Sequence, residues 1–305
     1  MIRLISFLAG RRGFTFVITG IYLFFIVFYH RKVSAVFDWL RDSYSFELYN
    51  AAALQVSLIL LIFFSAFVYT GLKKLKEKLK AGILWCYSLL LVLLSYFLLI
   101  TVNIEVIHFI QYALLAVPVF ALVLRYGETV FWVTLMGAID EAYQYFVLYR
   151  DNNTVYFDFN DVILNLVGAG IGVTLIYTLA HSKNDVSFSA SPPERKGFKS
   201  PVITMTLAVS LLILGLYSTG FIKSHPEENG AGTFIVSSRQ SAAPGFWTVP
   251  EKSKPFHIVP LLEGMSILAL LLASYSMMDS RGGSVVPVSG KAFLDKMQEI
   301  DRNGL

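Results

Sequence analysis

The sequence is dominated by uninterrupted apolar blocks about 20 residues long, and these blocks restrict the possible folds more than any other feature. A helix of about 20 apolar residues crosses the hydrocarbon core of a bilayer, which is about 30 Å thick. Hydrophobic residues make up 55% of the 305-residue chain and charged residues only 15%, compared with about 25% charged residues in typical soluble domains. We therefore predict an all-α fold, a polytopic transmembrane helix bundle in a lipid bilayer.

The apolar blocks predict eight membrane spans, at residues 14–30, 51–71, 82–101, 105–124, 129–149, 159–180, 202–222 and 259–279. Lys and Arg concentrate on the cytoplasmic side of membrane proteins. The link between the second and third spans, GLKKLKEKLK, carries five lysines, so we place it in the cytoplasm. Alternation then puts both termini in the cytoplasm, with 17 of the 25 basic residues inside and 8 outside. The excess of basic residues, a net charge of +4, is therefore interpreted as an orientation signal in the membrane, and no nucleic-acid partner is predicted.

The spans form two membrane blocks separated by a polar linker. No pattern in the sequence indicates the oligomeric state. In chain order we expect two N-terminal helices with the basic loop (1–81), a four-helix core (82–181), a cytoplasmic linker (182–201), two further helices (202–280) with an outer loop at 223–258, and a cytoplasmic tail (281–305).

Three neighbouring spans carry polar residues at helical spacing near their outer ends. Residues at positions i, i+3 and i+7 lie on one face of a helix. The three stripes are Glu105, His108 and Tyr112 on the fourth span; Asp140, Glu141 and Gln144, with Arg150 at the exit, on the fifth; and Asp158, Asp161 and Asn165 on the sixth. We expect them to line one outward-facing pocket, with Arg150 at the rim and Asp140 in its depth.

The adjacent carboxylates of Asp140 and Glu141 indicate chemistry at bilayer depth. A charge there costs about 2.5–3.5 kcal/mol, and such residues are usually functional. Two neighbouring carboxylates in a medium of low dielectric constant repel each other, so at least one is expected to hold a proton near neutrality. With His108 in reach, His108, Asp140 and Glu141 are the candidate catalytic residues, acting as general acid and base. Candidate substrate-binding residues are Glu105, Tyr112, Gln144, Arg150, Asp158, Asp161 and Asn165, with Arg150 suited to an anionic group.

Other single features have simpler interpretations. Glu105 and His108, with nearby acidic residues, could hold a divalent metal, but no other established ligand spacing is present and we assign no metal. No cofactor can be identified from the sequence. Gly168 and Gly172 form a GxxxG spacing that predicts close helix packing. The histidines outside the stripes are expected to be ordinary surface or interfacial residues: His30, His181, His225 and His257.

The order of these polar residues resembles the VanZ-like family of bacterial membrane proteins. The family pattern is H-F-x-x-Y on one helix, D-E-x-x-Q on the next, then R, D-x-x-D and N-x-x-G-A. The stretches IHFIQYALL, AIDEAYQYF and YRDNNTVYFDFNDVILNLVGAGIG reproduce every element, over about residues 82–180. Glu105 departs from the pattern, since some members carry Lys there. The resemblance implies a cell-envelope protein of the bacterial cytoplasmic (inner) membrane and an association with resistance to the glycopeptide antibiotic teicoplanin.

Three functions are compatible with these residues. In the first, the pocket binds, with or without modifying it, a lipid-linked or amphipathic substrate such as a cell-wall lipid precursor or a lipid head group. In the second, the carboxylates carry protons in a transporter or flippase, although the inner halves of the fourth to sixth spans contain almost no ionisable residues. In the third, the polar cluster fixes helix register in a non-catalytic scaffold or shield. The cost of buried charge favours the first.

Overall fold

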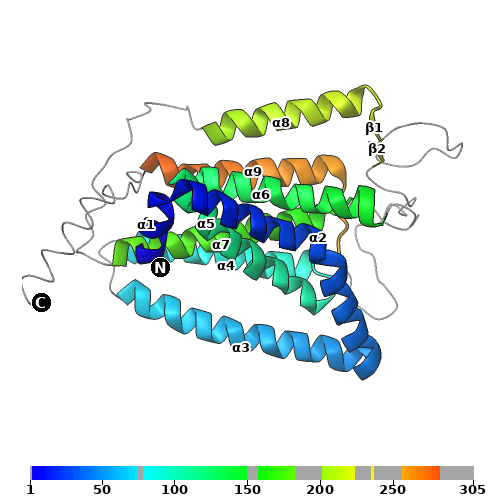
Figure 1. The fold of residues 1–305 in the computed structure, drawn as a ribbon, viewed down its shortest axis with the longest axis horizontal. Helices are drawn as coiled ribbons and strands as arrows, with labels where there is room; N and C mark the ends of the chain where they lie inside the picture. Colours follow the sequence, from blue (N-terminus) through cyan, green and yellow to red (C-terminus); the bar gives the residue numbers. More distant parts are fainter. Residues whose placement is uncertain are drawn as a thin grey trace, which may run out of the picture.

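The chain folds into a bundle of long helices that run along a common axis (Figure 1). The computed structural model describes residues 2–73, 78–149, 157–182, 201–223, 235–236 and 256–281. Helices make up nearly all of these residues, which confirms the predicted all-α class. The exception is a pair of two-residue parallel strands, β1 (Ile222–Lys223) and β2 (Ile235–Val236).

In chain order, the helices are α1 Ile2–Gly10, α2 Arg12–Tyr44, α3 Phe46–Lys73, α4 Lys78–Leu98, α5 Ile107–Val123, α6 Tyr126–Tyr143, α7 Phe159–Ser182, α8 Pro201–Ser218 and α9 Leu261–Arg281. A 3₁₀ turn, η1 (Asn103–Val106), precedes α5, and a π turn, η2 (Gln144–Leu148), continues α6. Successive long helices run in opposite directions (Figure 1). We call the end at which α5 and α7 begin the site end, and the opposite end, where α1 lies and α9 finishes, the far end.

Of the described helices, seven are long and apolar enough to cross a membrane: α2, α3, α4, α5 together with η1, α7, α8 and α9. The one predicted span not among these seven is the fifth (129–149), which corresponds to α6, whose 18 residues include Glu128, Asp140 and Glu141. Despite these charges, α6 runs the length of the bundle beside α9 and packs against α5 and α7 (Figure 1). The protein is therefore a multi-pass membrane protein, and the eight apolar blocks correspond to eight long helices.

Residues 31–50, which connect the first two predicted spans, are helical apart from one residue. Only Ser45, in the left-handed conformation with φ 72°, separates α2 from α3. This segment carries charged side chains, and Arg41 pairs with Asp38 at 2.9 Å. Hydropathy locates only the apolar window of a helix, and α2 continues into polar sequence beyond its window.

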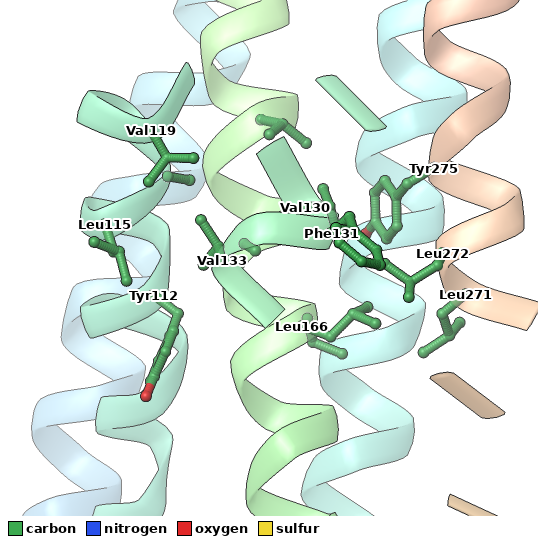
Figure 2. Packing of buried hydrophobic residues seen from close by; sticks show 14 of the residues in the cluster. Tyr112, Leu115, Val119, Val130, Phe131, Val133, Leu166, Leu271, Leu272 and Tyr275 are labelled. Atoms are coloured by element: carbon green, nitrogen blue, oxygen red, sulfur yellow. The ribbon is translucent and has the colours of Figure 1, made fainter. Parts of the chain in front are cut away.

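The hydrophobic core is centred on α7. In the apolar window of α7, 83% of residues are buried, against 6% in α3 and in α8, which lie on opposite outer sides of the bundle (Figure 1). Figure 2 shows how the core is filled: Tyr112, Leu115 and Val119 follow one another along α5, while Leu272 and Tyr275 enter from α9. The apolar surfaces of α3 and α8 thus remain available to lipid.

Two glycines of α7 set its close approach to α5. A Cβ atom at Gly168 would lie 2.9 Å from the carbonyl oxygens of His108 and Phe109, and one at Gly172 would lie 2.7 Å from the carbonyl oxygen of Ala113. Any side chain at these positions would push the helices apart. The predicted role of the GxxxG spacing in close helix packing is confirmed.

The last helix, α9, belongs to the same bundle. Tyr275 packs over Gly170 of α7, where a Cβ atom would meet the tyrosine ring. At the far end, Asp279 accepts hydrogen bonds from the backbone N–H groups of Tyr126 (2.7 Å) and Gly127 (2.9 Å) at the start of α6. The final span is therefore part of the core, although it follows the four-helix segment in sequence. The predicted linker (182–201), outer loop (223–258) and tail (281–305) lie mostly outside the described residues.

Candidate functional site

The structure brings the three polar stripes together at the site end of the bundle. We use the term site cluster for His108 and Tyr112 of α5, Asp140 and Glu141 of α6, Gln144 of η2, and Asp161 and Asn165 of α7. The side chains of His108 and Asp161 are 10% and 21% exposed, and each of the other members is at most 8% exposed as a whole residue. Charged groups buried this deeply in a membrane bundle are costly unless they are well paired.

His108 is held between two residues of α7. Its Nδ1 lies 2.9 Å from Oδ1 of Asn165, and its Nε2 lies 3.6 Å from Oδ2 of Asp161. Because an amide oxygen can only accept, Nδ1 carries the proton and Nε2 faces the carboxylate. The ring also lies nearly parallel to that of Tyr112, with an interplanar angle of 8° and 6.4 Å between centroids. The imidazole therefore has one fixed orientation and one nitrogen available for proton exchange.

Asp140 is the most deeply buried carboxylate of the site cluster, at 1% exposure. Its Oδ2 accepts a hydrogen bond from the hydroxyl of Tyr112 at 3.3 Å. Its Oδ1 has no partner at hydrogen-bonding distance among the residues that the structure describes, and the side-chain amide of Gln144 is a further polar neighbour of this carboxylate. A buried polar atom left without a partner costs about 1–3 kcal/mol. This oxygen is therefore a candidate contact for a ligand.

Glu141 lies beside Asp140 and is supported by the π turn that follows. Its Oε1 accepts a hydrogen bond from Nε2 of Gln144 at 3.1 Å, and Gln144 is the first residue of η2. Its electrostatic neighbours include Asp161, Asp158 and Asp140. π turns inside helices are frequent at functional sites, and this one was not expected from the helical period of the sequence. The π turn places the Gln144 amide against a carboxylate that is otherwise surrounded by negative charge.

The carboxylates of Glu105 and Asp158 accept hydrogen bonds from backbone N–H groups at helix starts. Glu105 accepts hydrogen bonds from two N–H groups that precede and begin η1, at 2.8 and 3.3 Å. Asp158 caps α7 by accepting the N–H of Asn160 at 2.9 Å. Alignment of Glu105 with His108 assumed one continuous α-helix, but Glu105 lies in η1, where three residues complete a turn. Both residues thus stand at the edge of the site cluster, with helix capping as their observed contact.

Arg150, expected at the rim, lies outside the described residues, and its place there stays a prediction. Over the ranges that the structure describes, no group of three or more His, Cys, Asp or Glu side chains meets in an arrangement suited to a metal ion. Both oxygens of Glu105 are taken up by backbone N–H groups. The alternative of a metal held by Glu105 and His108 therefore gains no support from the geometry.

His30 lies at the site cluster, although the sequence indicated only an interfacial residue. Its electrostatic neighbours are His108 and Asp161. The position results from the packing of α2 over the site end, where the ring of Phe28 lies 4.9 Å from that of Tyr143. No spacing on α2 signalled this, because His30 and His108 are 78 residues apart in sequence and approach each other only through the packing of α2 on α5.

Asn160 positions the start of α7 and was also missed. Its Nδ2 donates to the carbonyl oxygens of Leu99 (3.1 Å) and His257 (2.7 Å), and its Oδ1 accepts the N–H of Val259 (3.0 Å). The end of α4 and the chain before α9 are thereby joined to the turn that carries Asp161. The available signal was a lone Asn between two acidic residues at a helix start.

Polar contacts between α4 and α7 toward the far end are neutral. Nε1 of Trp85 donates to Oγ1 of Thr178 at 2.8 Å, and the hydroxyls of Ser88 and Thr174 lie 3.1 Å apart. Beyond Asp161, α7 contains no Asp, Glu, Lys or Arg, and α5 contains none at all. Charge is therefore confined to the site end of these two helices.

The comparison with family models decides the relationship of the chain to known proteins. The VanZ/LLP1 model matches residues 16–181. The chain belongs to the VanZ/LLP1 family. The match includes α3 and nearly all of α2, so it extends beyond the 82–180 segment that the motifs covered, and it includes His30. In this VanZ-like protein, α8 and α9 lie outside the family region. No protein of curated function and no solved structure matches the chain.

Proposed function

We propose that this VanZ-like membrane protein binds the polar part of a lipid-linked or amphipathic substrate at the site cluster and that His108 exchanges a proton with it. The observation that carries the proposal is the setting of His108, with Asn165 at 2.9 Å on one nitrogen and Asp161 at 3.6 Å from the other. An imidazole held in one orientation can act as a general base, and a nearby carboxylate stabilises the imidazolium that forms.

Each member of the arrangement has a defined contribution. Asn165 accepts from Nδ1 and so keeps Nε2 as the basic nitrogen. Nε2 takes a proton from a hydroxyl or amine of the substrate, and Asp161 stabilises the resulting imidazolium. A second donor–carboxylate pair lies one helical turn away, where the hydroxyl of Tyr112 donates to Asp140 at 3.3 Å. A positioned general base contributes about 10²–10⁴-fold to a rate.

We further propose that the site end faces the outside of the bacterial cytoplasmic membrane. Lys73 at the end of α3, and Lys78 and Lys80 at the start of α4, lie at the far end and support a cytoplasmic position for it. The substrate would then come from the cell envelope, as a lipid-linked cell-wall precursor or a lipid head group, and an effect on teicoplanin susceptibility is expected from the family resemblance.

The test uses the full-length protein expressed in a teicoplanin-susceptible bacterium. We expect the purified wild type to retain an amphiphile detectable by native mass spectrometry and to raise the inhibitory concentration of teicoplanin. His108→Ala and Asp140→Asn should lose both effects while membrane insertion persists, and Thr178→Val at the far end should keep them. Wild-type behaviour of both site variants would contradict the proposal.

One competing function is favoured by a specific observation. The contacts His108–Asn165 and Tyr112–Asp140 both cross between helices, as expected of a scaffold in which polar groups fix helix register. Such bonds contribute about 0.6 kcal/mol on average. A scaffold predicts that each site variant loses thermal stability in proportion to its loss of function. Measuring lipid binding and thermal unfolding on the same variants separates the two quantities.

A further inference from the structure

The hydrogen-bond inventory of the site cluster has an excess of acceptors. The hydroxyl of Tyr112 and the amide of Gln144 each donate to a carboxylate, at 3.3 and 3.1 Å, and the protonated nitrogen of His108 donates at 2.9 Å to an amide oxygen. Within the site cluster, Nδ2 of Asn165 is a buried side-chain donor without a partner among the described residues. The buried Oδ1 of Asp140 receives no donor from them. A ligand that contacts this oxygen while Asp140 is ionised must therefore donate hydrogen bonds.

The same group of side chains is strongly acidic. Asp140, Glu141 and Asp161 lie within electrostatic range of one another. Within the described part of the chain, no Lys or Arg forms an ion pair with any of the three. His108 and, near it, His30 are their titratable basic neighbours. Since buried charges in proteins are paired, the described part of the cluster is complementary to a cation.

The cation that fits is a primary ammonium group. A metal ion is disfavoured because the described residues provide no group of three suitable side chains. A quaternary ammonium carries no N–H and cannot satisfy the unpartnered oxygen. A primary ammonium carries three donors and no acceptor, and its hydrogen bonds to a carboxylate are charge-assisted and strong. It therefore matches both the charge and the hydrogen-bond inventory.

We infer that the site cluster holds the primary ammonium group of a membrane amphiphile, with Oδ1 of Asp140 as its innermost contact and the partly exposed Asp161 at its entrance. This inference rests on the proposed function and names the substrate class. The chemistry is shared by two sources, a phosphoethanolamine head group and an aminoacylated lipid, which the experiment separates. Nδ2 of Asn165 is then left to bind an oxygen near the ammonium in the same head group.

The experiment titrates delipidated full-length protein in detergent with short-chain phosphatidylethanolamine, lysyl-phosphatidylglycerol, phosphatidylcholine and phosphatidylglycerol, with native mass spectrometry as the readout. The two primary amines should bind about tenfold or more tightly than phosphatidylcholine, the effect expected from one hydrogen bond to a charged group. Competition between them identifies the preferred source. Asp140→Asn should remove this preference, and Asp279→Asn, a matched change at the far end, should retain it.

The selectivity of the wild type decides the inference independently of the folding of any variant. Equal affinity for phosphatidylethanolamine and phosphatidylcholine would overturn the ammonium assignment. If His108→Ala then still weakened the binding of all four lipids, the proposed function would survive that result. If the binding of no lipid depended on His108 or on Asp140, both the ammonium assignment and the proposed function would be contradicted.

Discussion

Two aspartates stand at opposite ends of α6 and are used in opposite ways. Asp279 of α9 places its two oxygens on the N–H groups of Tyr126 (2.7 Å) and Gly127 (2.9 Å), where the helix start has free donors and a favourable dipole. Asp140 accepts one longer bond, at 3.3 Å, and its other oxygen has no partner among the described residues. The difference teaches that burial of an acid does not by itself indicate function. Incomplete hydrogen bonding is the more informative sign.

The largest effect is expected from Gly168→Leu, which disrupts the packing of α7 against α5 beside the site cluster. The new side chain would press on backbone carbonyl oxygens 2.9 Å away, and backbone atoms cannot rotate aside. Unfolding free energy should fall by about 3 kcal/mol, and ligand binding should be lost. The measurement is thermal unfolding in detergent. Gly215→Leu in α8, where no atom lies within 4 Å, is the control, and equal stability of the two variants would contradict the packing account.

His108→Gln is expected to lower ligand affinity by about tenfold to hundredfold, the range for hydrogen bonds to charged groups. Glutamine keeps a donor for Asn165 but cannot titrate, so the fold should persist while proton exchange stops. Lipid occupancy by native mass spectrometry, read beside the unfolding temperature, checks this. Full retention of function would show that the imidazole only holds two helices together.

Asp279→Ala should act on stability alone. Loss of the helix cap at Tyr126 and Gly127 is expected to cost about 0.5–2 kcal/mol of unfolding free energy, measured by denaturation in mixed micelles. Asp279→Asn should recover part of this loss because an amide oxygen still accepts one N–H. A change in lipid selectivity in the folded variant would remove the contrast with Asp140.

The smallest effect is expected at the neutral contact between α4 and α7. Thr178→Val removes the acceptor of the Trp85 indole, which lies 2.8 Å away, and should cost about 0.6 kcal/mol. Ligand binding should not change. A loss comparable to that of Asp279→Ala would mean that the neutral contacts, rather than the caps, determine the stability of the bundle.

Much of the bundle could be predicted because its signals are local. Block length located the long helices, and the small residues at 168 and 172 indicated which face of α7 is in close contact. The spacing of His108 with Tyr112, and of Asp161 with Asn165, placed each pair on one face of its helix. Because α5 and α7 lie side by side, those two faces meet in the structure.

The remainder depended on contacts that no local pattern contains. The 3₁₀ turn η1 directs Glu105 to backbone N–H groups, and the π turn η2 changes the phase at Gln144. His30 reaches the cluster only through the packing of α2. The incorporation of α9 into the core depends on the fit of Tyr275 against Gly170, a tertiary contact across about 100 residues of chain.

The most direct test of the central claim, that the site cluster serves a ligand rather than helix register, is the unfolding of wild type and Asp140→Asn with and without phosphatidylethanolamine. A ligand that binds only the folded state stabilises it by about 2.7 kcal/mol at 100 times its dissociation constant. We predict that without lipid the variant is at least as stable as the wild type, because a buried carboxylate is removed, and that only the wild type gains stability from lipid. A variant that is less stable without lipid and gains as much from lipid as the wild type would contradict the account.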